Sequence, residues 1–305
     1  MEKKIKFRVE YILFKIFIYA IRISPLFLKG WYGKVVLLVF KLAGKRYEKL
    51  VVSNIKIAFP ELDKQGREKL KKEIYDHFSA VLVDIIYLFG GKSPEQVIGK
   101  VRVEGIEIIE SAIKNGKGAV LFSAHFGNWE LIPYILNKKM NVRINSIARK
   151  MDNPLTEKIV KKFRHFMGSE IIYKDGSLRK MLRILESNGM VYLLVDQNTI
   201  TREGVPVLFF GREVIAVTTV AQINLKKGVP VIPLFLTYEG KEKVLRIGDP
   251  VECERSGDSS EDIIRFTQKT MMMIEKNIKT RPEQWFWFHD RWRRRSGQTG
   301  SEDEK

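Results

Sequence analysis

Two residues near the middle of the chain, His125 and Glu130, are of the types that move protons in enzymes. A carboxylate that holds one imidazole nitrogen leaves the other nitrogen able to accept a proton from a hydroxyl group near neutral pH. The hydroxyl can then attack an activated carbonyl such as a thioester, as in a Ser-His-Asp triad with a substrate hydroxyl in place of the serine. The same spacing also fits an inert capped helix beside a hydrogen-bonded histidine, so the surroundings must decide.

The five-residue spacing restricts how the two side chains can meet. On one continuous helix they would lie about 140° apart, so His125 has to stand outside a helix. The segment GAVLFSAH at 118–125 is typical of a short buried strand that ends at the histidine. Gly127 allows a bend, and Glu130 then falls in a first helical turn, where the dipole favours a carboxylate that can fold back to the imidazole. This places His125 where open α/β sheets bind ligands.

Strand-like and helix-like segments alternate along the rest of the chain. Strands are predicted near 118–125, 142–148, 170–173, 190–195 and 231–237, and helices near 128–138, 152–167, 177–187 and 260–279. The run Ser93-Pro94-Glu95-Gln96 predicts an earlier helix start with a capping box. Such alternation predicts an α/β fold: a single domain with a largely parallel central sheet flanked by helices.

The N-terminal part of the chain is both apolar and basic. Residues 1–50 contain twelve Lys and Arg against three Glu, so a surplus of nine of the chain's net charge of +18 lies there. Around the apolar run 9–28, Arg8, Lys15 and Arg22 are seven residues apart, which puts them in one stripe along a helix. The pattern predicts helices that lie in a membrane interface. A true span stays open, although it would place two of these cations in the hydrocarbon.

The composition divides the chain into three parts and argues against other classes of protein. Residues 1–45 are expected to form membrane-anchoring or interfacial helices, 46–295 one domain, and 296–305 a disordered tail. Cys253 is the single cysteine, and no second His lies at ligand spacing from His125, so neither a metal nor another cofactor is expected. The charge would suit a nucleic-acid-binding protein, but no nucleic-acid motif is present and the apolar N-terminus does not fit one.

Polar residues lie at or after the ends of the later predicted strands, just as His125 lies at the end of the strand predicted at 118–125. Those at a strand end, or on the helix after it, are Arg149, Asn153, Arg164, Asp196 and Gln197. Because the carboxyl ends of parallel strands share one edge of a sheet, we expect these side chains to gather around the histidine. A compact block, PEQWFWFHDRW at 282–292, adds several aromatic residues and a further histidine.

The order and spacing of these motifs resemble those of the bacterial lipid A biosynthesis acyltransferases of the late, lauroyl- or myristoyl-transferring type. These enzymes are related to the glycerophosphate and lysophospholipid acyltransferases. The resemblance runs from the N-terminal helices to about Arg294, and the block at 282–292 is its most specific piece. The family's His-x4-Glu dyad falls on His125 and Glu130. Its further motifs fall on Arg149 with Asn153, on Arg164, and on Asp196 with Gln197.

This resemblance implies an O-acyltransferase that moves a fatty acyl group from acyl-acyl carrier protein to a hydroxyl of a lipid A precursor. The reaction would take place at the cytoplasmic face of the inner membrane, with His125 as general base oriented by Glu130. Either Arg149 or Arg164 would stabilise the developing oxyanion or bind a phosphate of the acceptor sugar. A phosphatidylinositol mannoside or a lysophospholipid stays open as the acceptor, because related dyads act on such lipids.

The C-terminal block carries two further expectations. His289 lies among tryptophans and is expected to be a buried structural histidine. The basic run at 291–295 is expected to meet anionic lipid headgroups or an acidic acyl carrier protein.

Overall fold

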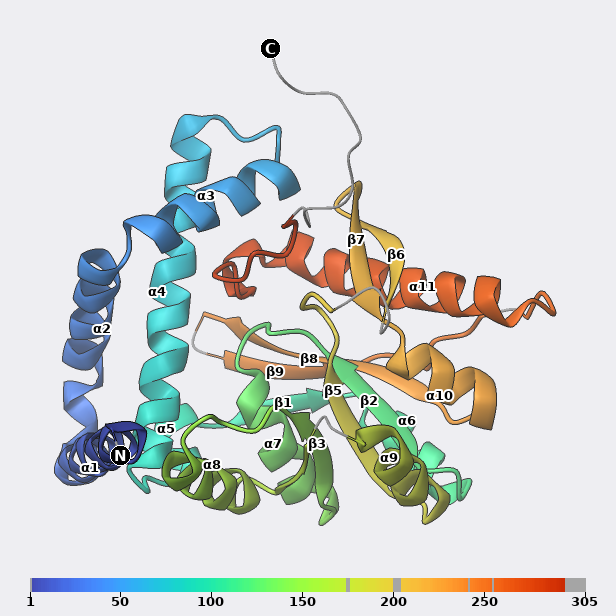
Figure 1. Cartoon of the computed structure of the whole chain (residues 1–305), viewed down its shortest axis with the longest axis horizontal. Coiled ribbons are helices and arrows are strands. Elements are labelled where there is room, and N and C mark those ends of the chain that lie inside the picture. Colours follow the sequence, from blue (N-terminus) through green and yellow to red (C-terminus); the bar gives the residue numbers. More distant parts are fainter. Residues whose placement is uncertain (1, 174–175, 200–203, 241, 254, 294–305) are drawn as a thin grey trace.

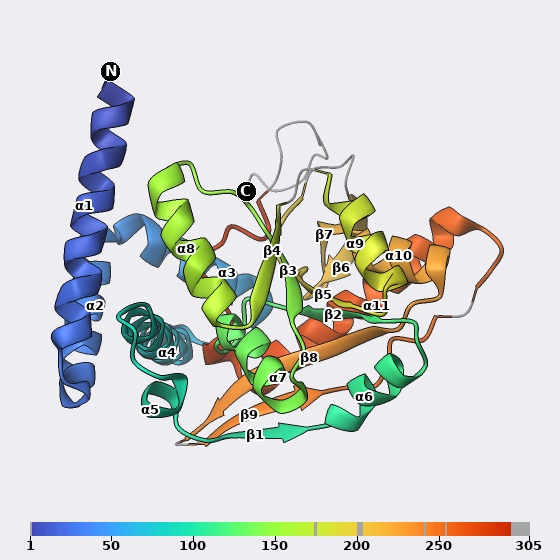
Figure 2. The same cartoon turned by 90° about the horizontal axis from the view of Figure 1, so that it is seen from below.

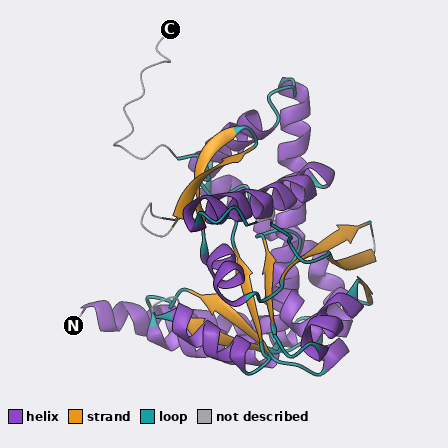
Figure 3. Ribbon diagram, turned by 90° about the vertical axis from the view of Figure 1, so that its right-hand side faces the viewer, coloured by secondary structure: helices purple, strands orange, loops and turns teal. Residues whose placement is uncertain are grey.

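A seven-stranded sheet forms the centre of the protein, and helices pack on both of its faces (Figure 1, Figure 3). The computed structural model describes residues 2–173, 176–199, 204–240, 242–253 and 255–293. A two-stranded hairpin, β6–β7, stands beside the sheet, and the N-terminal helices lie at one side of the molecule (Figure 1).

Five central strands run parallel in the order β8-β2-β5-β3-β4. Beyond β8, strand β9 is antiparallel to it, and β1 pairs parallel with β9. The strands are β1 Val101–Glu104, β2 Ala119–Ser123, β3 Ile144–Ala148, β4 Ser169–Tyr173, β5 Met190–Leu194, β6 Gly204–Phe209, β7 Arg212–Val217, β8 Val231–Glu239 and β9 Glu242–Ile247. The predicted largely parallel sheet is confirmed, and the carboxyl ends of its central strands share one edge.

Helices connect these strands and cover the sheet. The α-helices are α1 Glu2–Ile23, α2 Lys29–Ala43, α3 Lys45–Ala58, α4 Lys64–Phe89, α5 Pro94–Ile98, α6 Ile106–Lys114, α7 Ile132–Met140, α8 Pro154–Phe166, α9 Ser177–Glu186, α10 Thr219–Lys227 and α11 Ser259–Thr280. Short 3-10 turns are η1 Leu26–Leu28, η2 Trp129–Leu131 and η4 Pro282–Gln284.

Strand β2 is buried on both sides, which explains why its sequence is continuously apolar. Val120 and Phe122 belong to one core cluster together with Phe266 of α11. Leu121 belongs to a second cluster together with Ile132 of α7. Each fully buried side chain of this size contributes about 1.5–3 kcal/mol relative to exposure. Packing on both faces of the sheet therefore fixes the end of β2, from which the chain leads through Ala124 to His125.

The predicted elements agree closely with the observed ones. Each of the five predicted strands and each of the four helices of the alternating region is present within a few residues of its expected ends, although the helix near 128–138 begins as the turn η2. The capping box is also confirmed, since Ser93 Oγ accepts from the Gln96 backbone at 3.2 Å and Gln96 Oε1 accepts from the Ser93 backbone at 3.3 Å. The hairpin β6–β7 and the last two strands beyond β8, β9 and the edge strand β1, are additions that the sequence pattern did not predict.

Helix α1 lies at the edge of the molecule against α4 and α8 (Figure 2). Its outward face is an apolar stripe that includes the exposed residues Ile5, Val9, Ile12, Ile16 and Ile23. The predicted helices of this segment are thus present, and their contact with a membrane stays a prediction. Within the described residues, no helix alone has the length and hydropathy to cross a membrane, and Lys4–Ile23 with Leu26–Leu38 qualifies only as a pair bent by 113°.

Candidate active site

The neighbouring strands β2 and β5 bring His125 and Asp196 together. In their parallel register Ser123 lies opposite Leu194, and a single residue then separates each from the histidine or the aspartate. The backbone N–H of Val195 donates to the carbonyl of Ser123 at 3.1 Å, so the pairing extends past the strand ends. The two side chains therefore emerge side by side at the carboxyl edge of the sheet.

Asp196 holds the imidazole of His125 by a direct hydrogen bond. The distance from His125 Nδ1 to Asp196 Oδ1 is 2.8 Å, and Asp196 Oδ2 accepts from the His125 backbone N–H at 3.1 Å. The indole Nε1 of Trp285 also donates to Oδ2, at 2.9 Å. Asp196 is only 2% exposed, whereas the His125 side chain is 21% exposed. The carboxylate is thus a buried support, and the imidazole is the group that a substrate can reach.

The charges of this pair stabilise each other. Burial alone would raise the pKa of Asp196 and lower that of His125, because it penalises the charged forms. Their attraction and hydrogen bond outweigh burial, so the pKa of Asp196 lies below its ordinary value and the pKa of His125 lies above its own. The charge of Glu130 adds to the second effect. Asp196 therefore remains ionised at neutral pH and increases the basicity of the imidazole.

The loop after His125 depends on a glycine. Gly127 has a φ of +59°, and a Cβ at this position would lie 1.7 Å from the carbonyl oxygen of Leu236. Its N–H donates to the carbonyl of Gln284 at 2.9 Å. The bend expected at Gly127 is therefore present, and it leads into η2, whose first turn contains Glu130.

Glu130 binds Arg164, which corrects the expectation that it holds the imidazole. Arg164 Nη2 and Nε donate to the two carboxylate oxygens of Glu130 at 2.8 and 3.3 Å, in a bidentate ion pair. The physical reason is strand order, because the β2–β5 register delivers Asp196 directly to Nδ1 of His125. Glu130 influences the histidine through space and fixes the guanidinium of Arg164.

A cavity of about 750 Å³ opens beside the imidazole. The predicted site residues that line it are His125, Glu130, Arg149, Arg164 and Gln197. Its apolar wall includes Trp129, Met181 and Leu193. Since Nδ1 is occupied by Asp196, Nε2 is the imidazole nitrogen available to a ligand, which would replace the 3.4 Å hydrogen bond that Gln197 Nε2 donates to it. The cavity combines a base, two cations and an apolar wall.

Two of the predicted binding residues have different surroundings. Arg149 lines the cavity with a side chain that is 84% exposed, and its Nη2 donates to Asp152 at 3.3 Å. Asn153 is the N-cap of α8, where its side chain accepts from the Leu155 backbone and donates to the carbonyl of Phe7 in α1. Asn153 is not among the described residues that line the cavity. Its contacts join α8 to α1.

The C-terminal block holds the loops that carry His125 and Asp196 in place. The backbone N–H of Phe286 donates to the carbonyl of His125 at 2.9 Å, and Trp285 reaches Asp196 as described above. His289 Nε2 accepts from the backbone N–H of Asn198 at 3.2 Å, which gives this half-buried histidine a structural role. Burial lowers its pKa. The block is recognisable in the sequence as a motif, whereas nothing in the sequence indicated that the indole of Trp285 is a partner of the aspartate.

The basic run 291–295 was expected to meet lipid headgroups or acyl carrier protein, and the position of Arg291 corrects this expectation for that residue. It is 1% exposed, and its Nη1 donates to the carbonyl of Ile215 at 3.0 Å and to the side chain of Asn198. Its guanidinium carbon lies 5.6 Å from the centroid of the Phe209 ring, and burial lowers its pKa to about 10. Arg291 is therefore out of reach of lipid headgroups. The rest of the run beyond Arg293, and the predicted tail at 296–305, lie outside the described residues.

A series of buried polar side chains is hydrogen-bonded to the loop that follows His125. Asn128 Nδ2 donates to the hydroxyl of Tyr238 at 3.0 Å, and that hydroxyl donates to Asp84 at 2.9 Å. Asp84 also forms an ion pair with Lys29 at the start of α2. Burial and the neighbouring Asp84 raise the pKa of Tyr238, so its hydroxyl stays protonated. The N-terminal helices are thereby connected to the loop that follows His125.

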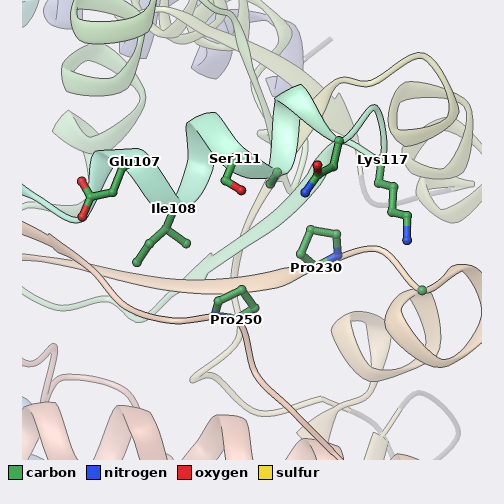
Figure 4. Close-up of a pocket in the computed structure, with 9 residues that line it drawn as sticks. Glu107, Ile108, Ser111, Lys117, Pro230 and Pro250 are labelled. Carbon is green, nitrogen blue, oxygen red and sulfur yellow. The ribbon is translucent and has the colours of Figure 1, made fainter.

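A second hollow, of about 550 Å³, lies at the other end of the sheet (Figure 4). Glu107 and Ser111 of α6 face Pro230 and Pro250 across it, near the residues that precede β2 and β8. Its described lining contains no residue of the His125 cavity. None of the predicted site residues is among the described residues that line this hollow.

Comparison with known proteins gives a match over nearly the whole chain. The model of the family described as "Bacterial lipid A biosynthesis acyltransferase" matches residues 2–294. The chain is 26% identical over 256 residues to the lipid A biosynthesis lauroyltransferase of Escherichia coli (strain K12), which covers 82% of this chain and 80% of that protein. It is 21% identical over 247 residues to the lipid A biosynthesis myristoyltransferase of the same strain, covering 80% and 74%.

A second group of relatives comes from mycobacteria. The chain is 24% identical over 201 residues to the phosphatidylinositol mannoside acyltransferase of Mycobacterium tuberculosis (strain ATCC 25618 / H37Rv). This match covers 65% of this chain and 60% of that protein, so the chain spans about three fifths of the relative's length. Proteins with different acceptor lipids in their names are thus among its relatives.

Proposed function

Because the chain belongs to the bacterial lipid A biosynthesis acyltransferase family, we propose that it is a membrane-associated O-acyltransferase. Its donor is acyl-acyl carrier protein, and its acceptor is a hydroxyl of a lipid A precursor. The observation that carries this proposal is the imidazole of His125, held at Nδ1 by the buried Asp196 and placed at a cavity with cationic and apolar walls. Such a site suits a hydroxyl nucleophile, an anionic sugar and a fatty acyl chain.

The proposed reaction begins with proton transfer to His125. Nε2 takes the proton of the acceptor hydroxyl as its oxygen bonds to the thioester carbonyl carbon, and the carbonyl oxygen becomes negative. The tetrahedral intermediate then collapses, the carbon–sulfur bond breaks, and the imidazolium returns the proton to the leaving thiolate. Asp196 accepts the Nδ1–H throughout, which keeps Nε2 in the form that can accept a proton.

We assign the two cavity arginines to different tasks. An oxyanion is best stabilised by a cation that is already fixed in place, and Arg164 is fixed by its two hydrogen bonds to Glu130. Arg149 is largely exposed and reaches outward, as suits a cation that binds a phosphate of the incoming acceptor. Glu130 acts as a positioning residue for Arg164.

The acceptor decides between two related functions. The match to a phosphatidylinositol mannoside acyltransferase favours a mannolipid acceptor as the second candidate. The test is transfer of a labelled acyl group by the purified full chain to a lipid A precursor, a phosphatidylinositol mannoside or a lysophospholipid, with product detected by mass spectrometry. We expect acylation of the lipid A precursor at a rate at least tenfold above that of the other two. Faster acylation of either other lipid would assign the site to that acceptor, and transfer to none of them would reject the proposal.

We further propose that α1 and α2 attach the protein to the cytoplasmic face of the inner membrane. The proposal rests on the exposed apolar stripe of α1 and on the basic residues Arg8, Lys15 and Arg22, which are exposed beside it. A helix with this division of apolar and basic faces lies in the interface, with its cations at the level of the headgroups.

Substitutions on the outward face of α1 test this attachment. We expect Ile5→Ser/Ile12→Ser/Ile16→Ser to weaken binding to phosphatidylcholine vesicles at least tenfold in a sedimentation assay, because the lost apolar contact is what holds the helix in the interface. Deleting residues 1–30 would be a poorer test, since it removes Lys29 from the buried Asp84.

The matched control is Leu208→Ser/Ile264→Ser/Met272→Ser, which changes three exposed apolar side chains elsewhere. This control variant is expected to bind vesicles as the wild type does. Equal binding of the wild type and the α1 variant would contradict the attachment.

A further inference from the structure

A groove separate from the His125 cavity lies between α1 and α8. Its volume is about 520 Å³, and the two helices stand next to each other at the edge of the molecule (Figure 2). The residues that line it are Tyr11 of α1 and Leu155, Lys158, Ile159, Lys161, Lys162 and His165 of α8. None of them lines the His125 cavity, so the reaction proposed above does not use this groove.

The rim of the groove is cationic. Lys158, Lys161 and Lys162 are exposed, and they form no ion pair with another residue in the described part of the chain. A further cation comes from α1, where Lys15 Nζ lies 5.5 Å from the centroid of the Tyr11 ring. No lining residue is acidic, although His165 Nδ1 lies 2.7 Å from Glu170 at one end. Three lysines of α8 therefore line one hollow, and Lys15 of α1 lies close to Tyr11, which also lines it.

The floor of the groove is apolar. Leu155 and Ile159 are one helical turn apart on α8 and half-buried, and the ring of Tyr11 faces them from α1. An acidic protein would supply carboxylates for the lysines but no slender apolar segment for this floor. A phospholipid offers both, because a phosphate is joined through glycerol to acyl chains. The outward stripe and Tyr11 of the groove belong to the same helix, α1, which brings the groove close to the proposed membrane surface.

We propose that the α1–α8 groove binds one anionic membrane phospholipid that is not a substrate. Lys158, Lys161 and Lys162 neutralise its phosphate, and Leu155 and Ile159 contact its glycerol and the first methylene groups of an acyl chain. The same helix carries Arg164 at the His125 cavity, so the bound lipid fixes the orientation of the cavity relative to the membrane. This inference rests on the proposed membrane attachment and is independent of the acyl-transfer chemistry.

Short-chain lipids test the groove without a membrane. Binding of dihexanoyl phosphatidylglycerol to the full chain is measured by calorimetry below the lipid's critical micelle concentration, with dihexanoyl phosphatidylcholine and inorganic phosphate as the other two probes. We expect saturable binding of the phosphatidylglycerol to one site. Phosphatidylcholine lacks the net negative charge and phosphate lacks the apolar part, so both are expected to bind at least tenfold more weakly.

Three variants separate the charge of the rim from the apolar floor. Lys158→Gln/Lys161→Gln/Lys162→Gln is expected to weaken phosphatidylglycerol binding at least tenfold. Ile159→Gln is expected to weaken it several-fold without any change of charge. The matched control, Lys64→Gln/Lys69→Gln/Lys72→Gln, removes three exposed lysines from the first turns of α4 and is expected to bind as the wild type does.

The outcomes distinguish this inference from the attachment on which it rests. Loss of phosphatidylcholine vesicle binding in the α1 stripe variant supports attachment whether or not the groove binds lipid. Equal affinity of the rim variant and the α4 control for phosphatidylglycerol would overturn the proposal that the groove binds this lipid. The proposal that the groove binds a lipid would also be wrong if inorganic phosphate bound as tightly as phosphatidylglycerol. It would be wrong as well if the rim variant kept its affinity for phosphatidylglycerol and lost affinity only for acyl carrier protein.

Discussion

Replacing His125 with alanine is expected to lower the rate constant of acyl transfer by about three orders of magnitude, because it removes the imidazole that takes the proton from the acceptor hydroxyl. The measurement is single-turnover transfer from labelled acyl-acyl carrier protein at saturating acceptor. The affinity for the acceptor is expected to change little, since the cavity arginines remain.

The fold of this variant is expected to persist. Asp196 keeps two donors, the backbone N–H of His125 and the indole of Trp285, so the carboxylate is not left without partners. We therefore expect the free energy of unfolding to fall by only about 1–2 kcal/mol, as measured by denaturant titration. A folded variant with a wild-type rate would refute the proposed base.

Replacing Asp196 with asparagine is expected to lower the maximal rate by about 10²- to 10⁴-fold. The amide of the variant would donate to Nδ1 and leave Nε2 protonated, which is the wrong tautomer for a base. The acid limb of the pH–rate profile should also move. A neutral His125 is required, so the wild-type rate falls as the pH drops through the raised pKa of the imidazole, and loss of Asp196 shifts this fall to lower pH.

Glu130→Gln is the matched comparison for Asp196→Asn. It removes the charge that fixes Arg164 but leaves the hydrogen bond between His125 and Asp196 intact. We expect a loss of rate with a smaller shift of the acid limb than Asp196→Asn produces. If Glu130→Gln gave the larger shift, Glu130 would be the carboxylate that controls the imidazole, and the role given to Asp196 would be wrong.

The local conformation around His125 was predictable from the sequence. The apolar run before it predicted the buried strand, and Gly127 predicted the bend that its positive φ now confirms. These features depend on near neighbours in the chain, through side-chain burial and backbone sterics. The same reasoning placed Arg164 on a helix and Asp196 at a strand end.

The partner of the imidazole was not predictable in the same way. Glu130, five residues from the histidine, was expected to hold the ring, whereas Asp196 was expected only as a binding residue close to it. The lateral order of the strands decides otherwise, since β5 is the neighbour of β2 and their register aligns Asp196 with His125. Sequence separation carries little information on such contacts, because strand pairing joins segments that are far apart in the chain.

The burial and the partners of individual polar side chains were also decided by the tertiary structure rather than by the sequence pattern. Asn153 has the type and position of a binding residue, yet it caps α8 and joins it to α1. Arg291 belongs to a basic run, yet it lies in the core against Phe209. A charged or polar residue type predicts exposure only on average, and its actual partners depend on what the fold packs against it.

By itself, the sequence determined the alternating elements, the strand end that carries the histidine, the bend after it and the apolar and basic faces of the first helix, because all of these arise from interactions within a few residues. Only the tertiary structure decided that Asp196 holds His125 and that Glu130 holds Arg164. These pairs form where separate strands and helices meet, and their distances follow from strand register and packing of the sheet.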